Sequence, residues 1–183
     1  QARIVNEDGR PLPPNQIGEL VCQGPNVMQG YYKNEEATKE TIKDGWLYTG
    51  DLATIDEDGY LYIVDRKKDM IVSGGENIYP REIEEVLFRH SAIADVAVVG
   101  IPDPIWGETV KAFIVLKEGK MINEQEVIDF CKGHLASYKK PRAIEFVSSI
   151  PKNPSGKPLK RLLKERDGKG GDGEKVSNLK LLT

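Results

Sequence analysis

The residue whose type and setting could do chemistry most directly is Lys157. It stands at residues 151–158, PKNPSGKP, after a glycine and before a proline. This segment ends like a phosphate-binding P-loop, but that loop requires a glycine where Pro151 stands and a Ser or Thr where Pro158 stands. A P-loop NTPase is therefore excluded.

The second candidate is the carboxylate of Asp51, which follows Gly50 in the segment YTGD at residues 48–51. A carboxylate at the mouth of a strand can accept two hydrogen bonds from a vicinal diol such as a ribose, and ionised acceptors form the stronger bonds. Four-residue segments of this kind also occur in ordinary turns. Asp51 alone therefore does not establish a nucleotide site.

Two further patterns do not complete a site. Cys131 and His134 stand three residues apart on an expected helix, but no second pair of ligands completes a metal site, so we interpret them as a core cysteine and a surface histidine. Gly74 and Gly75 do not complete the GxGxxG pattern of a dinucleotide fold. We predict no metal site and no Rossmann site.

The elements that would position these groups change in kind near residue 66. Short strands separated by turns are expected first, at residues 2–5, 18–23, 46–48, 52–55 and 60–64, interrupted by one helix that Asn34 caps. Later segments alternate between strands and helices: strands at 93–99, 110–116 and 143–147, helices after Pro80 and Asn123, and a final helix at 159–164.

These patterns predict an α+β protein in three parts. Residues 1–65 form a short-strand β segment, and residues 66–166 form a small α+β domain with a three-stranded sheet and flanking helices. The Gly-rich residues 167–183 are expected to be a flexible tail.

Composition excludes several classes of protein. The 183 residues carry 26 Lys and Arg against 29 Asp and Glu, a net charge of −3, and no apolar run approaches the roughly 20 residues that span a bilayer. The basic C-terminal end lacks interleaved aromatic residues, so nucleic-acid binding is not expected. Two distant cysteines suit a reducing compartment, and we predict a cytoplasmic location.

A resemblance emerges when five segments are taken in order. Residues 46–51 (WLYTGD), 59–61 (GYL), 65–69 (DRKKD), 73–84 (SGGENIYPREIE) and 151–157 (PKNPSGK) resemble the successive motifs of adenylate-forming enzymes. Residues 18–20, 24–28 and 30–32 are similar to the acyl-CoA synthetase branch, which includes the fatty acyl-CoA and 4-coumarate-CoA ligases. The resemblance covers residues 1 to about 165.

This resemblance implies an enzyme that activates a fatty acid with ATP and Mg²⁺ to an acyl adenylate and then transfers the acyl group to coenzyme A. It implies that Asp51 holds the ribose hydroxyls, with Arg66 supplying a fixed fork of donors beside it. It implies that Lys157 is the catalytic lysine, which acts as a cation on the α-phosphate and not as a base.

The resemblance also implies that the C-terminal lid domain turns about a hinge at Lys68 between the two half-reactions. Gly75, together with Gly74, would line the path of the pantetheine arm, because a missing Cβ lets a ligand approach the backbone. The large N-terminal domain is absent, and the chain begins with Gln1 instead of Met. We therefore expect a piece of a longer ligase that is inactive without its N-terminal domain.

Two alternatives remain open. One is the adenylation domain of a peptide synthetase, whose acyl acceptor is a carrier protein, although residues 73–80 resemble the CoA-ligase version more. The other is a non-catalytic module that binds pantetheine or a protein partner.

Overall fold

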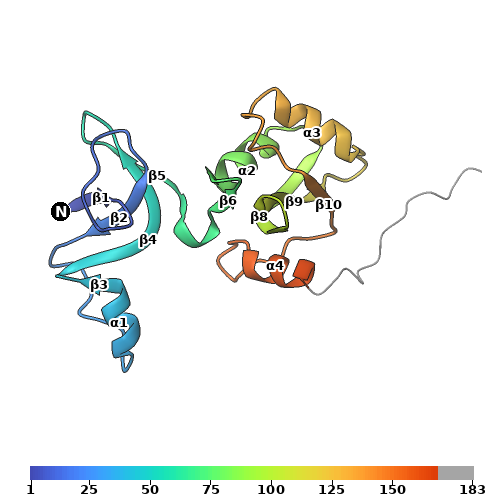
Figure 1. Ribbon diagram of the computed structural model, residues 1–183. Coiled ribbons are helices and arrows are strands. Elements are labelled where there is room, and N and C mark those ends of the chain that lie inside the picture. The colour runs from blue at the N-terminus through green and yellow to red at the C-terminus, as the bar shows by residue number, and fades with distance from the viewer. Residues whose placement is uncertain (169–183) are drawn as a thin grey trace, which may run out of the picture.

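The computed structural model describes residues 1–168, which form two units built on separate sheets (Figure 1). The first unit contains β1 (Ala2–Val5), β2 (Gly18–Cys22), α1 (Glu35–Thr41), β3 (Ile42–Lys43), β4 (Trp46–Ile55) and β5 (Leu61–Arg66). Its five strands pair antiparallel in the order β1-β2-β4-β3, and β5 also pairs with β4. Asn34 caps α1 as predicted, because its side chain accepts a hydrogen bond from the Ala37 N–H.

The second unit follows a short 3₁₀ turn, η1 (Lys67–Asp69). It contains β6 (Ile71–Ser73), β7 (Glu76–Ile78), α2 (Pro80–Phe88), β8 (Ile93–Asp103), β9 (Gly107–Leu116), α3 (Glu124–Lys132), β10 (Ala143–Phe146) and α4 (Lys160–Gly168). The sheet order is β10-β9-β6-β7, and β8 also pairs with β9. β10 joins β9 in parallel, and the other pairs are antiparallel.

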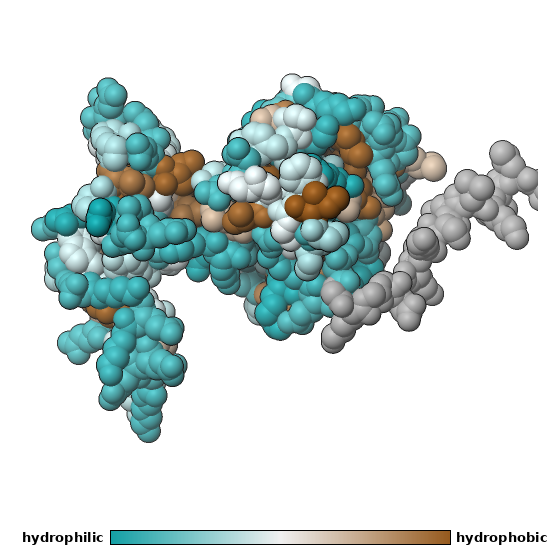
Figure 2. Space-filling model, in the orientation of Figure 1, coloured by the Kyte–Doolittle hydropathy of each residue, from teal (hydrophilic) through white to brown (hydrophobic). Residues whose placement is uncertain are grey.

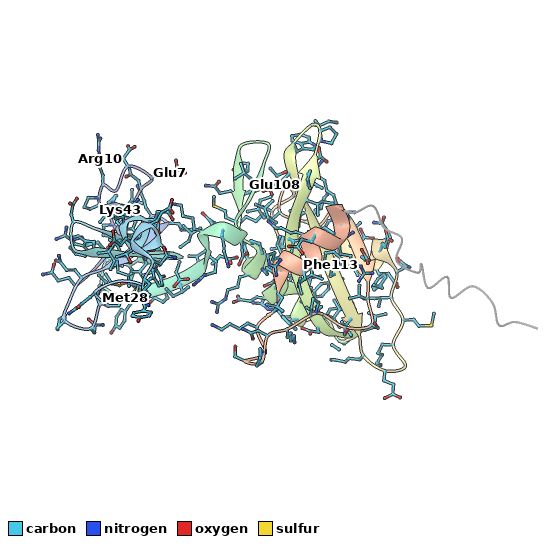
Figure 3. All side chains as sticks on the ribbon, turned by 90° about the horizontal axis from the view of Figure 1, so that it is seen from below. Glu7, Arg10, Met28, Lys43, Glu108 and Phe113 are labelled. Atoms are coloured by element: carbon cyan, nitrogen blue, oxygen red, sulfur yellow. The ribbon has the colours of Figure 1, made fainter. Side chains whose placement is uncertain are left out.

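Helices cover both faces of the second sheet (Figure 1). Ile83 and Leu87 of α2 and Val127 of α3 pack in one cluster with residues of β8 and β9, and all three are fully buried. On the other face, Leu163 of α4 packs against Phe113, which lies beneath this helix (Figure 3). The second unit is therefore a three-layer α/β/α arrangement with a core on each side of its sheet.

The prediction of an α+β fold is confirmed, but the prediction of a three-stranded sheet in the second unit is wrong. The strands β6 and β7 extend the sheet to five strands. Each is three residues long, too short for an alternating pattern to be visible in the sequence. In the first unit, β4 is a single strand where two were predicted: it continues through Gly50, and its pairing with β5 shifts register between Leu52 and Ala53.

The final helix also differs from the prediction. It continues to Gly168, four residues beyond the helix end expected at residue 164, and so includes the first two residues of the expected tail. Asp167, in the last turn of α4, forms an ion pair with Lys111 of β9, which ties this turn to the sheet. The rest of the expected tail, residues 169–183, lies outside the described residues. No helix in the described part of the chain is long and apolar enough to cross a membrane.

Candidate functional site

Asp51 and Arg66 lie opposite one another on the neighbouring strands β4 and β5. The Arg66 Nη1 donates to Asp51 Oδ1 at 2.8 Å. The Arg66 side chain is 51% exposed and that of Asp51 is 29% exposed. An ion pair this exposed contributes only about 0–1 kcal/mol to stability. The pair is therefore open to a ligand and has little structural role.

A network beneath this pair fixes the backbone of β4. The Thr49 hydroxyl donates to a backbone carbonyl of β2 at 2.8 Å and accepts the Asp51 N–H at 3.1 Å. The Gly50 N–H donates to one oxygen of Glu19 at 3.2 Å, and the other oxygen of Glu19 pairs with the Lys67 ammonium at 2.8 Å. Gly50 has φ +71°, a conformation that L side chains rarely adopt. The network thus holds Asp51 in place from two directions.

Sequence reasoning missed Glu19 and Lys67. Glu19 lies in residues 18–20, which the sequence connects only with the acyl-CoA synthetase branch. Lys67 is one of several charged residues in the linker. Their pairing across 48 residues of sequence leaves no local pattern, so only the fold brings it out.

The linker between the units is anchored on both sides but open in the middle. Lys67 is held to the first unit through Glu19, and Ile71 is fully buried in the core of the second unit. Lys68 is exposed, and within residues 1–168 neither its side chain nor that of Asp69 forms a hydrogen bond or ion pair. Among residues 1–168, a change of backbone angle at these two residues would therefore break no hydrogen bond or ion pair of their own side chains.

Gly74 and Gly75 form the two-residue turn between β6 and β7. Their φ values are +61° and +85°, and the flanking residues Ser73 and Glu76 are paired, as in a type I′ hairpin. A Cβ on Gly74 would lie 2.7 Å from the Trp106 ring, whereas one on Gly75 would meet nothing within 4 Å. Gly74 is thus packed, and Gly75 presents open backbone.

An exposed aromatic side chain and a cation lie beside this turn. The Gly74 N–H donates to the Trp106 carbonyl at 2.9 Å, and the Arg142 guanidinium lies 4.6 Å from the centre of the Trp106 ring. Trp106 is 41% exposed and its neighbour Ile105 is 80% exposed. The sequence analysis did not find these residues, although a tryptophan in the turn between two apolar strands was an available signal.

Lys157 stands in a preformed loop. The Asn153 Oδ1 accepts hydrogen bonds from the Ser155 N–H and hydroxyl at 3.0 and 2.8 Å and from the Lys157 N–H at 2.9 Å. Gly156 completes the turn with φ +81°. The Lys157 side chain is exposed, and in the described chain its ammonium has no ion-pair partner. The loop therefore presents a cation without neutralising it.

Ion pairs fasten both ends of this loop to the second unit. Lys152 pairs with Asp95 of β8 at 2.7 Å before the loop. After the loop, Lys160 pairs with Glu84 of α2 at 2.7 Å, and these two side chains are only 12% and 16% exposed. The loop of Lys157 is therefore attached to the second unit on both sides.

The structure brings Asp51 and Arg66 together but leaves the other predicted residues in separate places. Among residues 1–168, no hydrogen bond or ion pair joins Lys157, Gly74 or Gly75 to that pair. The loop of Lys157 adjoins α4, and the glycine turn belongs to the β6–β7 end of the sheet (Figure 1).

No group of three His, Cys, Asp or Glu residues in the described ranges is arranged to hold a metal ion. Cys131 is fully buried, and burial raises the pKa of its thiol to about 11. His134 Nδ1 lies 2.9 Å from the carbonyl oxygen of Phe130. The imidazole ring of His134 also lies beside the Phe130 ring, tilted against it. Neither residue has the setting of a metal ligand.

Comparison with known proteins shows which proteins this chain is similar to. Residues 82–157 match the AMP-binding enzyme C-terminal domain. The chain is 50% identical over 161 residues to a 2-succinylbenzoate–CoA ligase of Bacillus cytotoxicus, covering 88% of this chain and 33% of that protein. It is 48% identical over 167 residues to a long-chain-fatty-acid–CoA ligase of Bacillus subtilis, covering 91% of this chain and 30% of that protein.

A solved structure agrees over the same span. ATP-bound MatB from Rhodopseudomonas palustris superposes with a TM-score of 0.85 at 40% identity, covering 90% of this chain and 33% of that chain. This chain thus spans about a third of the length of the relatives it matches. The chain is similar to CoA ligases of the adenylate-forming superfamily, and its residues 82–157 match the C-terminal domain of AMP-binding enzymes.

Proposed function

We propose that this chain supplies the ribose-binding carboxylate and the moving lid of a ligase that makes acyl-CoA, AMP and pyrophosphate from a carboxylic acid, ATP and coenzyme A. The activity belongs to a longer protein, since the chain spans only a third of its relatives. The chain alone is expected to turn over no substrate. The observation that carries the proposal is the preformed loop, in which the Lys157 ammonium is exposed and has no ion-pair partner among residues 1–168.

In the first half-reaction, a substrate carboxylate oxygen forms a bond to the α-phosphorus, and the bond to pyrophosphate breaks. Negative charge gathers on the non-bridging oxygens of the α-phosphate during this step. A positioned ammonium stabilises that charge more in the transition state than in the ground state. Lys157 has this role, with Mg²⁺ accompanying the ATP.

Asp51 is suited to the ribose of the nucleotide. Arg66 occupies its Oδ1, so Oδ2 can accept hydrogen bonds from the two ribose hydroxyls. The Arg66 guanidinium limits the rotation of the carboxylate and adds donors beside it. The pair therefore orients the nucleotide and takes no part in bond breaking.

In the second half-reaction, the thiol sulfur of coenzyme A bonds to the acyl carbon, and AMP leaves. The pantetheine arm would pass the open backbone at Gly75, and the exposed Arg142 beside Trp106 would meet phosphates of coenzyme A. Because Lys157 and Gly75 lie in different parts of one rigid unit, the unit must turn between the steps. We place the hinge at Lys68, next to the anchored Lys67.

We propose further that the first unit, residues 1–66, completes the adenylate-binding domain and that the lid begins beyond the hinge at Lys68, two residues past the predicted boundary at residue 66. A fatty acid is our proposed substrate class, although the matched relatives are named for both an aromatic and a fatty acid. The two free cysteines favour a cytoplasmic enzyme.

The decisive experiment uses a full-length chimera that joins this chain to the N-terminal part of the Bacillus subtilis long-chain-fatty-acid–CoA ligase. Lys157→Ala should slow adenylate formation, followed by pyrophosphate release, by about 10²- to 10³-fold. Thioester formation from supplied acyl adenylate should change little. Lys120→Ala, which removes another exposed loop lysine of the same unit, is the matched control and should leave both steps unchanged.

Equal losses in both half-reactions of the Lys157→Ala chimera would contradict the proposed role. Acyl transfer to a carrier protein in preference to coenzyme A would favour the peptide-synthetase alternative. Tight calorimetric binding of coenzyme A by residues 1–183 alone would favour the non-catalytic module.

A further inference from the structure

The carboxylate of Asp65 bonds to backbone groups on both sides of the linker. Asp65 Oδ1 accepts the N–H of Arg66 at 2.7 Å, at the end of β5. Asp65 Oδ2 accepts the N–H of Arg81 at 2.8 Å, in the first turn of α2. Asp65 is only 8% exposed, so water competes little for these bonds.

Helix α2 needs this carboxylate because its own sequence lacks a cap. Tyr79 occupies the N-cap position without a side-chain hydrogen bond, and Pro80 at the first helical position has no N–H. The Arg81 N–H is therefore the first donor of the helix that needs a partner. A negative charge at a helix N-terminus also interacts favourably with the helix dipole.

Little else connects the two units in this orientation. A hollow of about 330 Å³ separates Ile63 and Val64 of β5 from Tyr79 and Glu82 near the start of α2. Figure 2 shows apolar side chains gathered over the β5 side of this junction. The Glu82 carboxylate is occupied by Lys139 of its own unit at 2.8 Å. Within residues 1–168, the Asp65–Arg81 contact is the one side-chain hydrogen bond that crosses from the first unit to the second.

We propose that Asp65 is a positioning residue that holds the lid in the orientation of this structure by capping α2 from the opposite side of the hinge. Asp65 precedes Lys68 and Arg81 follows it, so a rotation at Lys68 separates the two partners. The bond must break before the lid can turn, and its loss favours other orientations. This inference rests on the proposed hinge but not on ligase activity, so the two can fail separately.

The first test measures the orientation of the units in residues 1–183 with paired spin labels. Labels at Glu57→Cys and Glu118→Cys, both exposed, report the distance between the units in a Cys22→Ser background, and buried Cys131 is not labelled. We expect a narrow distance distribution that broadens or shifts with Asp65→Ala, which removes both acceptor oxygens. The control is Asp69→Ala, which removes the same charge near the linker without removing a hydrogen bond, and it should leave the distribution unchanged.

A distribution that is identical in Asp65→Ala and the parent overturns the proposal. A second measurement needs no substitution at Asp65: amide exchange should show the Arg81 N–H protected in the parent chain, although it has no partner within its helix. An Arg81 amide that exchanges as fast as an unfolded chain also overturns the proposal.

The third measurement separates positioning from general stability. In the chimera, Asp65→Ala should change the ratio of the two half-reaction rates by about tenfold, the scale of a hydrogen bond to a charged group. A purely structural role would slow both steps alike and leave the ratio at its parent value, which would overturn the proposal. If the parent chimera forms no acyl adenylate, the ligase proposal fails, and the label distances still decide the role of Asp65.

Discussion

Glu84 of α2 joins three parts of the second unit through one carboxylate oxygen. Its Oε1 lies 2.7 Å from the Lys160 ammonium, at the end of the Lys157 loop, and accepts the N–H of Val98 at 2.8 Å. Val98 is fully buried on β8, and the ion pair is about one-seventh exposed. Through Glu84, helix α2 therefore accepts the Val98 N–H at the free edge of β8 and also holds the end of the Lys157 loop.

The cost of removing this carboxylate follows from these contacts. Glu84→Ala leaves a buried backbone donor unpaired, which costs about 1–3 kcal/mol. It also leaves the Lys160 ammonium without its partner, and breaking a buried ion pair costs about 3–5 kcal/mol in total. Because this pair retains some solvent contact, we expect a loss of about 3 kcal/mol. Glu84→Gln keeps an acceptor for Val98 and loses only the charge, so we expect about half as much.

Urea unfolding of the chain, monitored by circular dichroism, measures both losses of unfolding free energy. In thermal unfolding, a loss of 1 kcal/mol lowers the Tm of a chain of this length by about 2–4 °C, so Glu84→Ala should lower the Tm by about 6–12 °C. The control is Glu85→Gln, which removes an exposed i,i+4 partner of Arg81 and should change stability by less than about 0.5 kcal/mol. Equal losses for Ala and Gln would show that the bond to Val98 contributes nothing. A loss below about 1 kcal/mol for Ala would refute the reasoning.

The glycine turn and the thiols give two further predictions. Gly75→Ala should lower the free energy of unfolding by about 1–2 kcal/mol through backbone strain alone. Gly74→Ala should lower it more, because its Cβ also meets the Trp106 ring. A larger loss for Gly75→Ala than for Gly74→Ala in urea unfolding would contradict this prediction. Cys22 should react with a thiol reagent at pH 8 while Cys131, whose pKa burial raises to about 11, reacts only in denaturant. Equal reaction rates in the folded chain would contradict the second prediction.

Elements with strong local signals could be predicted from the sequence. The helix after Asn123 carries a capping box with Glu126, and both of its hydrogen bonds form in the structure. Pro80 begins α2, as its fixed φ favours at a first helical position. Such signals involve residues within one turn of each other, so they do not depend on the rest of the fold.

Elements defined by distant partners could not be predicted. The strand β6 pairs with β7 and through Ser73 with Gly107 of β9, and three residues have no period of their own. The last turn of α4 has the composition of a loop, yet Asp167 contacts Lys111, 56 residues earlier. In both places tertiary contacts outweigh local propensity.

The candidate site divides in the same way. The residue types at Asp51, Arg66 and Lys157 could be chosen from ordered motifs, while the groups that hold them came only from the fold. Glu19 supports β4 from another strand, and Glu84 fastens the lysine loop from another helix. Their roles in the site stay predictions until the substitutions are measured.

The attachment of the two candidate surfaces to one rigid unit gives the strongest reason for movement. The loop of Lys157 is tied to the second unit through Glu84, and the turn at Gly74 is tied to it through a bond to Trp106. A rigid body cannot bring two separate parts of its surface to the same nucleotide at the same time. If Lys157 acts on the phosphate and Gly75 admits the thiol arm, the steps must be separated in time by a rotation. The linker supplies the place for it, since Lys68 lies just past the last residue that is anchored to the first unit.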